Sequence, residues 1–198
     1  MKRRTIDRIV SWLGLGLSAF LFVTAGLLNW GYSFANDSVS EQLAAQKINF
    51  PAADSESLKS LADQDRQSIE PFAGLALTTG KQAKAYADHY IGAHVKGIAG
   101  GKTYSEISGE ALAASAQSRA NPDDSELAAE AATLMGQRQS LFMGETLKGL
   151  LGYAYAFWQL GQIAMYAMWA ALAGAVLMFI LSMLGFMHLR RTPEDVIL

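Results

Sequence analysis

The stretch GLLGYAYAFWQLGQIAMYAMWAALAGAVLMFILSMLGFMHL, Gly149 to Leu189, decides the fold, because none of its 41 residues carries a formal charge. A second uncharged stretch, IVSWLGLGLSAFLFVTAGLLNWGYSFAN, runs from Ile9 to Asn36. A helix of about 20 apolar residues crosses the roughly 30 Å hydrocarbon core of a bilayer. Both stretches exceed that length, so the sequence predicts two membrane spans with a polar segment between them.

We therefore expect an all-α protein in which two transmembrane helices flank a mostly helical extracytoplasmic domain. As a single helix, Gly149 to Leu189 would be about 62 Å long, twice the hydrocarbon thickness, so only its second half is assigned to the span. The predicted parts are a cytoplasmic tip (1–8), a first span (9–29), an extracytoplasmic helical domain (30–148), an aromatic interfacial segment (149–162), a second span (163–187) and a cytoplasmic tail (188–198).

Charge sets the predicted orientation. Basic side chains flank both spans at the chain ends, whereas the middle, Asp37 to Lys148, carries 15 acidic residues against 10 basic ones, a net charge of −5. Basic residues mark the cytoplasmic side, so we expect a two-pass protein of the plasma (inner) membrane with both termini cytoplasmic. An acidic exported segment also argues against nucleic acid as a partner.

The first uncharged stretch has an alternative interpretation as a cleaved signal peptide, because Ser33-Phe34-Ala35 has the small-x-small pattern of a cleavage site. The apolar core of a signal peptide is 7–15 residues long, however, and this stretch is far longer. A retained anchor is therefore the main prediction.

Start and stop signals predict the helices of the middle segment. Ser38 and Glu41 form a capping box before a helix from Val39 to Ile48, and Thr103 and Glu106 form another. A weakly amphipathic helical segment is predicted over 58–69. Apolar residues three and four apart predict a helix over 81–99 with His94 on its buried face, and two glycines are predicted to end this helix. Asn121 and Pro122 are predicted to begin the helix that leads into the second span.

No residue set in the chain predicts chemistry. There is no cysteine, and the three histidines do not share a helix face, so we expect no metal site and no cofactor. Gly101-Lys102-Thr103 resembles the end of a phosphate-binding loop, but Lys96 stands where that motif needs glycine, so no nucleotide site is predicted.

The candidate partner contacts lie on the spans and on the aromatic segment. Small residues let helices approach closely in a membrane, and aromatic residues dominate interface hot spots. Arg138 is predicted to orient the aromatic region through charge-assisted hydrogen bonds. The candidates are Gly14, Ala171 and Gly174 for close helix approach, Trp158, Tyr155 and Phe157 as apolar anchors, and Arg138.

Three stretches in this order resemble a known family. They are VSEQLA from Val39 leading to Lys47-Ile48, His94 followed by GGKTYSE from Gly100, and RQSLF from Arg138. The order resembles an actinobacterial family of small two-span membrane proteins that are often mislabelled as aromatic ring-opening dioxygenases. The resemblance implies an accessory subunit, with the cytochrome bcc–cytochrome oxidase supercomplex of electron transport as the candidate complex.

The sequence is compatible with three classes of function to different degrees. The main prediction is a non-catalytic accessory or assembly subunit that contacts lipid and other integral membrane subunits. The alternative is an extracytoplasmic module that senses or binds a small ligand and is anchored by the two spans. A hydrolase or dioxygenase is disfavoured, because ring cleavage needs an iron held by histidines and a carboxylate, and no such trio is present.

Overall fold

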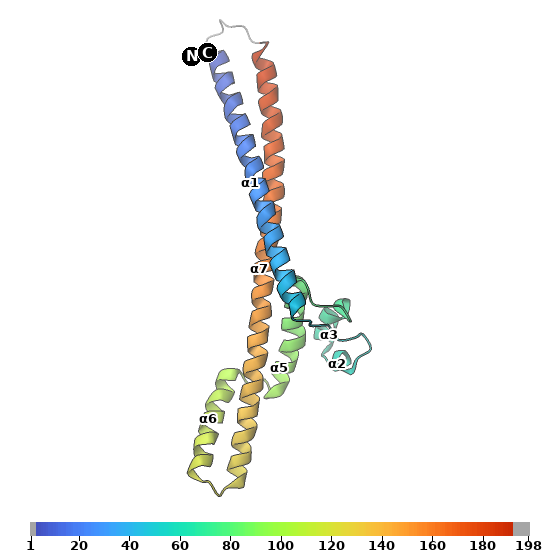
Figure 1. Ribbon diagram of the computed structural model, residues 1–198, viewed down its shortest axis with the longest axis vertical. Coiled ribbons are helices and arrows are strands. Elements are labelled where there is room, and N and C mark those ends of the chain that lie inside the picture. Colours follow the sequence, from blue (N-terminus) through green and yellow to red (C-terminus); the bar gives the residue numbers. More distant parts are fainter. Residues whose placement is uncertain (1–2, 192–198) are drawn as a thin grey trace. The chain divides into compact units, whose positions relative to one another are not determined.

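The computed structural model describes residues 3–191, and this part of the chain is all-helical, without strands (Figure 1). One isolated β-bridge joins Asn49 to Ala76. The elements are α1 (Arg3–Ala45), α2 (Glu56–Lys59), α3 (Asp63–Ile69), the 3₁₀ turn η1 (Glu70–Phe72), α4 (Gly80–Ala85), the π-helix η2 (Tyr86–Ile91), α5 (Gly92–Ile98), α6 (Tyr104–Ala120) and α7 (Ser125–Leu189). Residues 1–2 and 192–198, which belong to the predicted cytoplasmic tip and tail, lie outside the described residues.

The chain divides into two compact units. The hairpin unit contains the described residues 3–37 and 159–191, and the central unit is Ser38–Trp158. The predicted aromatic segment, residues 149–162, belongs to the central unit up to Trp158 and to the hairpin unit beyond it.

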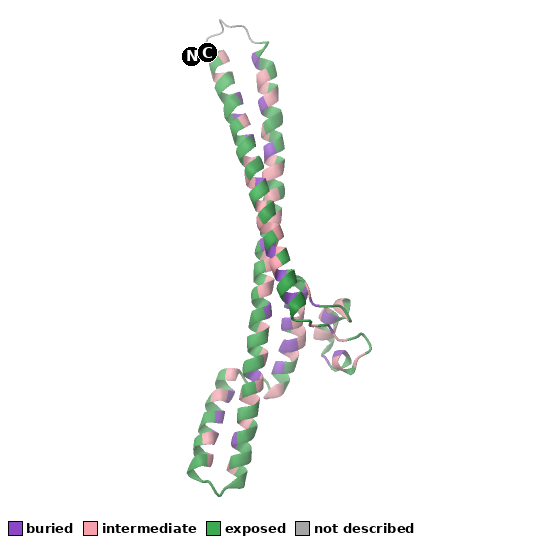
Figure 2. Cartoon of the chain, in the orientation of Figure 1, coloured by how far each residue is buried: buried purple, intermediate pink, exposed green. Residues whose placement is uncertain are grey.

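In the hairpin unit, α1 and α7 pack antiparallel along a seam of covered residues (Figures 1 and 2). The covered positions alternate three and four residues apart on both helices, which is the seven-residue repeat of a coiled coil. On α1 they are Ser11, Gly14, Ser18, Leu21, Ala25, Leu28, Tyr32 and Ala35, and on α7 they are Gly161, Ala164, Met168, Ala171, Ala175, Met178, Ser182, Gly185 and Leu189.

Small side chains make this seam narrow. The Ser18 hydroxyl donates a hydrogen bond to the Ala175 carbonyl oxygen at 2.8 Å, which joins the two helices directly. A Cβ atom added at Gly161 would lie only 2.9 Å from the Ala35 Cβ. Many large apolar residues on the other faces of the two helices are exposed, and Figure 2 shows exposed positions along both helices. The hairpin unit is therefore stabilised by close backbone approach between the helices.

The central unit has a core of its own. Ile69, Leu77 and Leu141 are completely buried in it, together with the C-terminal part of α1 and the α7 residue Leu151. The other buried residues of this core are Val39, Leu43, Phe50, Leu58, Leu61, Ala83, Ala87, Ile91, Val95 and Ile107. Helices too short to be stable alone, such as α2 and α3, are held by this packing.

The predicted helix start at Ser38 is wrong, because α1 continues through it without interruption to Ala45. Val39 and Leu43 are buried, so the apolar stripe of α1 continues into the core of the central unit. Extending an existing helix costs less free energy than nucleating a new one, which explains why the capping signal is not used.

The predicted helix over 81–99 is present as α4, η2 and α5 in succession, and it ends as expected at Gly100 and Gly101, which have φ angles of 62° and 88°. The burial predicted for His94 is wrong, because this residue is exposed. The His94 Nδ1 atom lies 2.7 Å from the carbonyl oxygen of Tyr90, one turn earlier in the chain. The wide π-helical turn keeps the buried stripe at a spacing of four residues (Ala83, Ala87, Ile91, Val95), which leaves His94 outside it.

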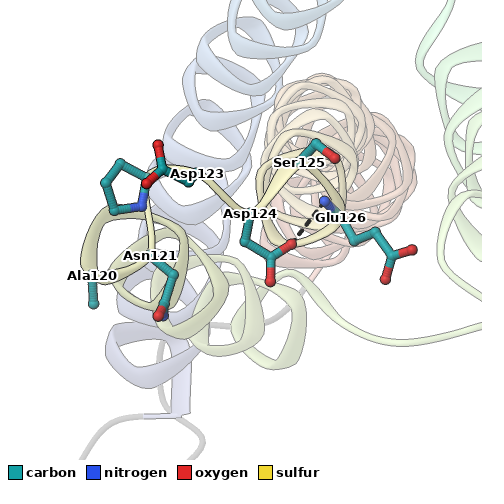
Figure 3. Close-up of a pocket in the computed structure, with 7 residues that line it drawn as sticks. Ala120, Asn121, Asp123, Asp124, Ser125 and Glu126 are labelled. Carbon is teal, nitrogen blue, oxygen red and sulfur yellow. Dashed lines mark hydrogen bonds between the residues drawn. The ribbon is translucent and has the colours of Figure 1, made fainter.

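The predicted start of the last helix is three residues too early. Figure 3 shows the corner between α6 and α7, where Asp124, rather than Asn121, supplies the capping carboxylate. Asp124 Oδ1 accepts hydrogen bonds from the backbone N–H groups of Glu126 (2.9 Å) and Leu127 (3.1 Å). Asn121 instead ends α6, because the reversal between the two antiparallel helices needs the intervening residues.

Candidate interaction site

Trp158, predicted as an interface anchor, packs inside the central unit. Its side chain is partly buried against the core, and Gly80 at the start of α4 makes room for it. A Cβ atom added at Gly80 would lie 2.5 Å from Trp158 Cγ and 2.9 Å from Cδ2, closer than real Cβ contacts. Trp158 thus packs α7 against α4.

Tyr155 also contacts α4. The Lys84 ammonium lies 5.1 Å from the centre of the Tyr155 ring, and the Tyr155 and Trp158 rings are 6.0 Å apart. Lys84 also donates a hydrogen bond to Asp88 at 2.7 Å, which raises the pKa of Lys84 above its usual 10.5 despite a smaller opposing effect of burial. Two of the three aromatic candidates therefore serve the packing of their own unit.

The third candidate, Phe157, lies on an exposed apolar stripe of α7. Phe157 is 41% exposed and Tyr153 is 76% exposed. Three further exposed apolar residues precede them at helical spacing, namely Met143, Leu147 and Leu150. We call these five residues the α7 stripe. The spacing of three and four residues in the sequence is the signal that could have predicted this face. A prediction based on aromatic residues alone therefore misses Met143, Leu147 and Leu150.

Arg138 joins two helices of the central unit. Its Nε donates a hydrogen bond to the Ser108 hydroxyl at 2.9 Å, and its guanidinium lies 3.4 Å from the Tyr104 hydroxyl and 5.8 Å from the centre of that ring. Tyr104 in turn contacts the Phe142 ring at 5.8 Å. The side chain predicted to orient the aromatic region thus connects α7 to α6.

The small-residue candidates all lie in the hairpin unit. Gly14 packs against the Ser182 side chain, and a Cβ atom at Gly174 would touch Leu21 at 3.4 Å. Ala171 is half-buried at the same seam. Gly14 and Gly174 therefore contact the other long helix of the same chain.

The glycine-lysine-threonine corner has a structural role. Lys102 pairs with Glu110 at 2.7 Å, and Thr103 caps α6 in the predicted capping box with Glu106. The backbone N–H and the hydroxyl of Thr103 donate to the Glu106 carboxylate at 2.7 and 2.8 Å, which holds the pKa of Glu106 below its usual 4.5.

This capping box predicts a pH effect. A carboxylate whose pKa is lowered by folding stabilises the fold above its unfolded-state pKa, and the contribution is lost as pH falls through the folded-state value. The hydrogen-exchange protection factors at the first turn of α6, which are corrected for the intrinsic pH dependence of exchange, should therefore fall as pH drops below about 4.5. Thr103→Ala should raise the pKa of Glu106, as measured by NMR titration of its carboxyl carbon. Ser105→Ala, at an exposed neighbouring position, is the control, and equal titration curves for the two variants would contradict the prediction.

The histidines do not converge. His89 Nδ1 lies 2.8 Å from an oxygen of Asp65, which links η2 to α3, whereas His94 bonds to its own helix. Within residues 3–191 no group of three or more potential metal-ligating side chains is found.

The fold and these surfaces define the class of protein. It is an all-helical protein with two helices, α1 and α7, that are long and apolar enough to cross a membrane. Only 22% and 11% of their most apolar stretches are buried, whereas the core helix of a soluble protein would be mostly buried. This exposure suggests contact with the lipid bilayer. Comparison of the chain with protein-family models, with curated proteins and with solved structures finds no match.

Proposed function

We propose that this chain is a non-catalytic accessory or assembly subunit of a larger plasma-membrane complex. In this proposal the hairpin unit spans the membrane with both termini in the cytoplasm, and the central unit is extracytoplasmic. The resemblance described above makes an actinobacterial cytochrome bcc–oxidase supercomplex the candidate partner.

The α7 stripe is the observation that carries the proposal. It is a continuous row of large apolar side chains on a unit that already has a complete core of its own. Apolar surface of this kind is costly to leave in water, and extended apolar patches commonly mark contacts between proteins. Tyr153, the most exposed of the five residues, has the amphipathic side chain that interfaces favour.

The orientation is supported by charge. The described helix ends at one side of the hairpin unit carry Arg3, Arg4, Arg8, Arg190 and Arg191 against a single acid, Asp7. The central segment carries a net charge of −5, as counted above. This asymmetry follows the rule that basic residues remain on the cytoplasmic side.

The test is purification of the full chain with a C-terminal tag in mild detergent, followed by mass spectrometry and haem absorbance spectra of the eluate. We expect cytochrome subunits in the eluate of the wild-type chain. Tyr153→Glu should lower their yield at least several-fold, because it places a charge at the most exposed residue of the α7 stripe.

Gly152→Glu is the matched control, because it puts the same charge at an exposed position on the opposite face of the same helix, where nothing lies within 4 Å of an added Cβ atom. This variant should retain the partners. Elution of the wild-type chain alone, or equal losses in the two variants, would contradict the proposal.

One cavity supports the alternative of a small-ligand module. A pocket of about 290 Å³ in the central unit is lined by side chains of both charges, including Asp65, His94 and Lys96. This volume is near the lower limit for ligand sites, so only a small polar or zwitterionic molecule would fit. A thermal-shift screen of the full chain tests the alternative. A stabilising compound whose effect is lost in Lys96→Ala would favour it, and the absence of any stabilising compound would count against it.

A further inference from the structure

We propose that the hairpin unit binds one anionic phospholipid, with its headgroup on Arg8 and Arg190 and an acyl chain in a groove between the two helices. The inference rests on the hairpin lying in the bilayer and does not depend on the accessory-subunit role.

The groove lies beside the helix seam and has a volume of about 550 Å³. Its wall is almost wholly apolar, because the one hydroxyl in it, that of Ser18, is already bonded to the Ala175 carbonyl oxygen. Leu15, Phe22, Val176 and Phe179 supply most of its larger side chains. Such a groove suits a hydrocarbon chain and offers no hydrogen-bonding partner for a polar ligand.

The seven-residue repeat places two arginines on the side of the hairpin where the groove opens. Arg8 precedes Leu15 by seven residues and Phe22 by fourteen, so all three occupy the same position of the repeat. Arg190 directly follows the last residue of α7. It lies fourteen residues after Val176, so it has the same position of the seven-residue repeat as Val176. Residues at one position of such a repeat remain on one face of the paired helices. Both arginines are exposed, so their guanidinium groups are accessible at the end of the groove.

The depth of the groove matches one lipid leaflet. At 1.5 Å per residue, Leu15 lies about 10 Å and Val23 about 22 Å along the helix from Arg8. A bilayer of 40–45 Å places its midplane about 20–22 Å from the outer headgroup surface. The groove therefore covers the acyl region of the leaflet whose headgroups lie at Arg8. The Trp12 and Phe186 rings meet edge-on, with centres 5.4 Å apart, at a depth between Arg8 and the groove. Aromatic residues are common at this interfacial depth of a membrane.

Charge favours a lipid over another apolar helix as the occupant. A guanidinium group binds phosphate oxygens in a bidentate manner, and basic pockets at the cytoplasmic ends of membrane helices bind anionic headgroups. A purely apolar helix would gain nothing from Arg8 and Arg190. Arg3 occupies another position of the repeat and already lies 4.0 Å from Asp7, so it is not assigned to the lipid.

Native mass spectrometry of the purified full chain tests the proposal. The probes are dioleoylphosphatidylglycerol and dioleoylphosphatidylcholine, which share acyl chains and differ in headgroup charge. We expect the anionic lipid to be retained in preference, and the double variant Arg8→Gln/Arg190→Gln to reduce that preference roughly twenty-five-fold, or about fivefold per arginine. The matched control, Arg3→Gln/Arg191→Gln, removes the same charge at other positions of the repeat and should keep the preference.

A second variant tests the groove separately from the charge. Ala19→Trp fills the groove with a large side chain and should lower retention of the anionic lipid while every arginine remains. The proposal would be overturned if the wild-type chain retained the two lipids equally, or if the two arginine double variants changed the lipid preference equally. It would also be overturned if Ala19→Trp retained the anionic lipid as well as the wild-type chain does. The experiment uses the isolated chain, so its result is independent of whether cytochrome subunits co-purify.

Discussion

Replacing Gly80 with alanine is expected to destabilise the central unit by about 1–3 kcal/mol, the usual cost of overpacking a well-filled core. The new Cβ atom would meet Trp158 at its Cβ and Cγ atoms, which are too close to the backbone of α7 to move aside by rotation of the ring. Relief would require α4 and α7 to separate. The measurement is thermal unfolding of the full chain in mild detergent, together with hydrogen exchange of the peptides that contain α4 and η2.

Two controls identify the mechanism. Gly109→Ala lies in α6 with nothing within 4 Å of the added Cβ atom, so it should have no destabilising effect and should stabilise its helix by about 0.5–1 kcal/mol. In a Trp158→Ala background, Gly80→Ala should cost much less than it does alone, because neighbouring substitutions that share a contact are not additive. Equal costs of Gly80→Ala in the two backgrounds would show that Trp158 is not the obstacle.

Replacing Gly14 with leucine is expected to separate the two helices of the hairpin unit. Gly14 is buried against the Ser182 side chain, so a leucine there has no space. In a membrane the helices gain no hydrophobic driving force from pairing, and their association depends on close packing of small residues. The loss of a single close contact should therefore have a large effect.

A disulfide reports this separation, because the chain has no cysteine of its own. A Cβ atom at Gly185 would lie 3.4 Å from the Ser11 Cβ, close to the 3.5–4.5 Å that a disulfide requires. Ser11→Cys/Gly185→Cys should therefore cross-link readily in isolated membranes, and adding Gly14→Leu should lower the yield several-fold. Gly16→Leu is the matched control, because a Cβ atom there meets nothing within 4 Å and should leave the yield unchanged. Equal yields for the Gly14 and Gly16 variants would refute the packing described for the seam.

Local signals in the sequence predicted the features that depend on neighbouring residues alone. The capping box at Thr103 and the glycine stop at Gly100 and Gly101 are present as expected, because each is satisfied within one turn of the chain. The two apolar stretches likewise predicted the two membrane-length helices, because composition and length suffice for that inference.

Two local signals in the sequence gave a wrong prediction, and only one of them was overridden by distant contacts. Ser38 has the residues of a helix start, yet burial of Val39 and Leu43 in the central core keeps α1 continuous. The π-helical turn in η2 moves His94 out of the buried stripe, and no residue pattern in the sequence announces that turn. For Ser38 the deciding contacts come from outside the segment, whereas for His94 the change lies in the helix geometry itself.

The amino-acid sequence by itself determined the helical class, the two long apolar helices and the charge asymmetry between the chain ends and the middle. Only the tertiary structure decided that Trp158 and Tyr155 pack on α4, that Gly14 faces Ser182 within the hairpin unit, and that the α7 stripe is left exposed. The physical reason is that hydrophobicity and helix propensity act along the chain. Which face of a helix is covered depends instead on the shapes of residues that are far away in sequence.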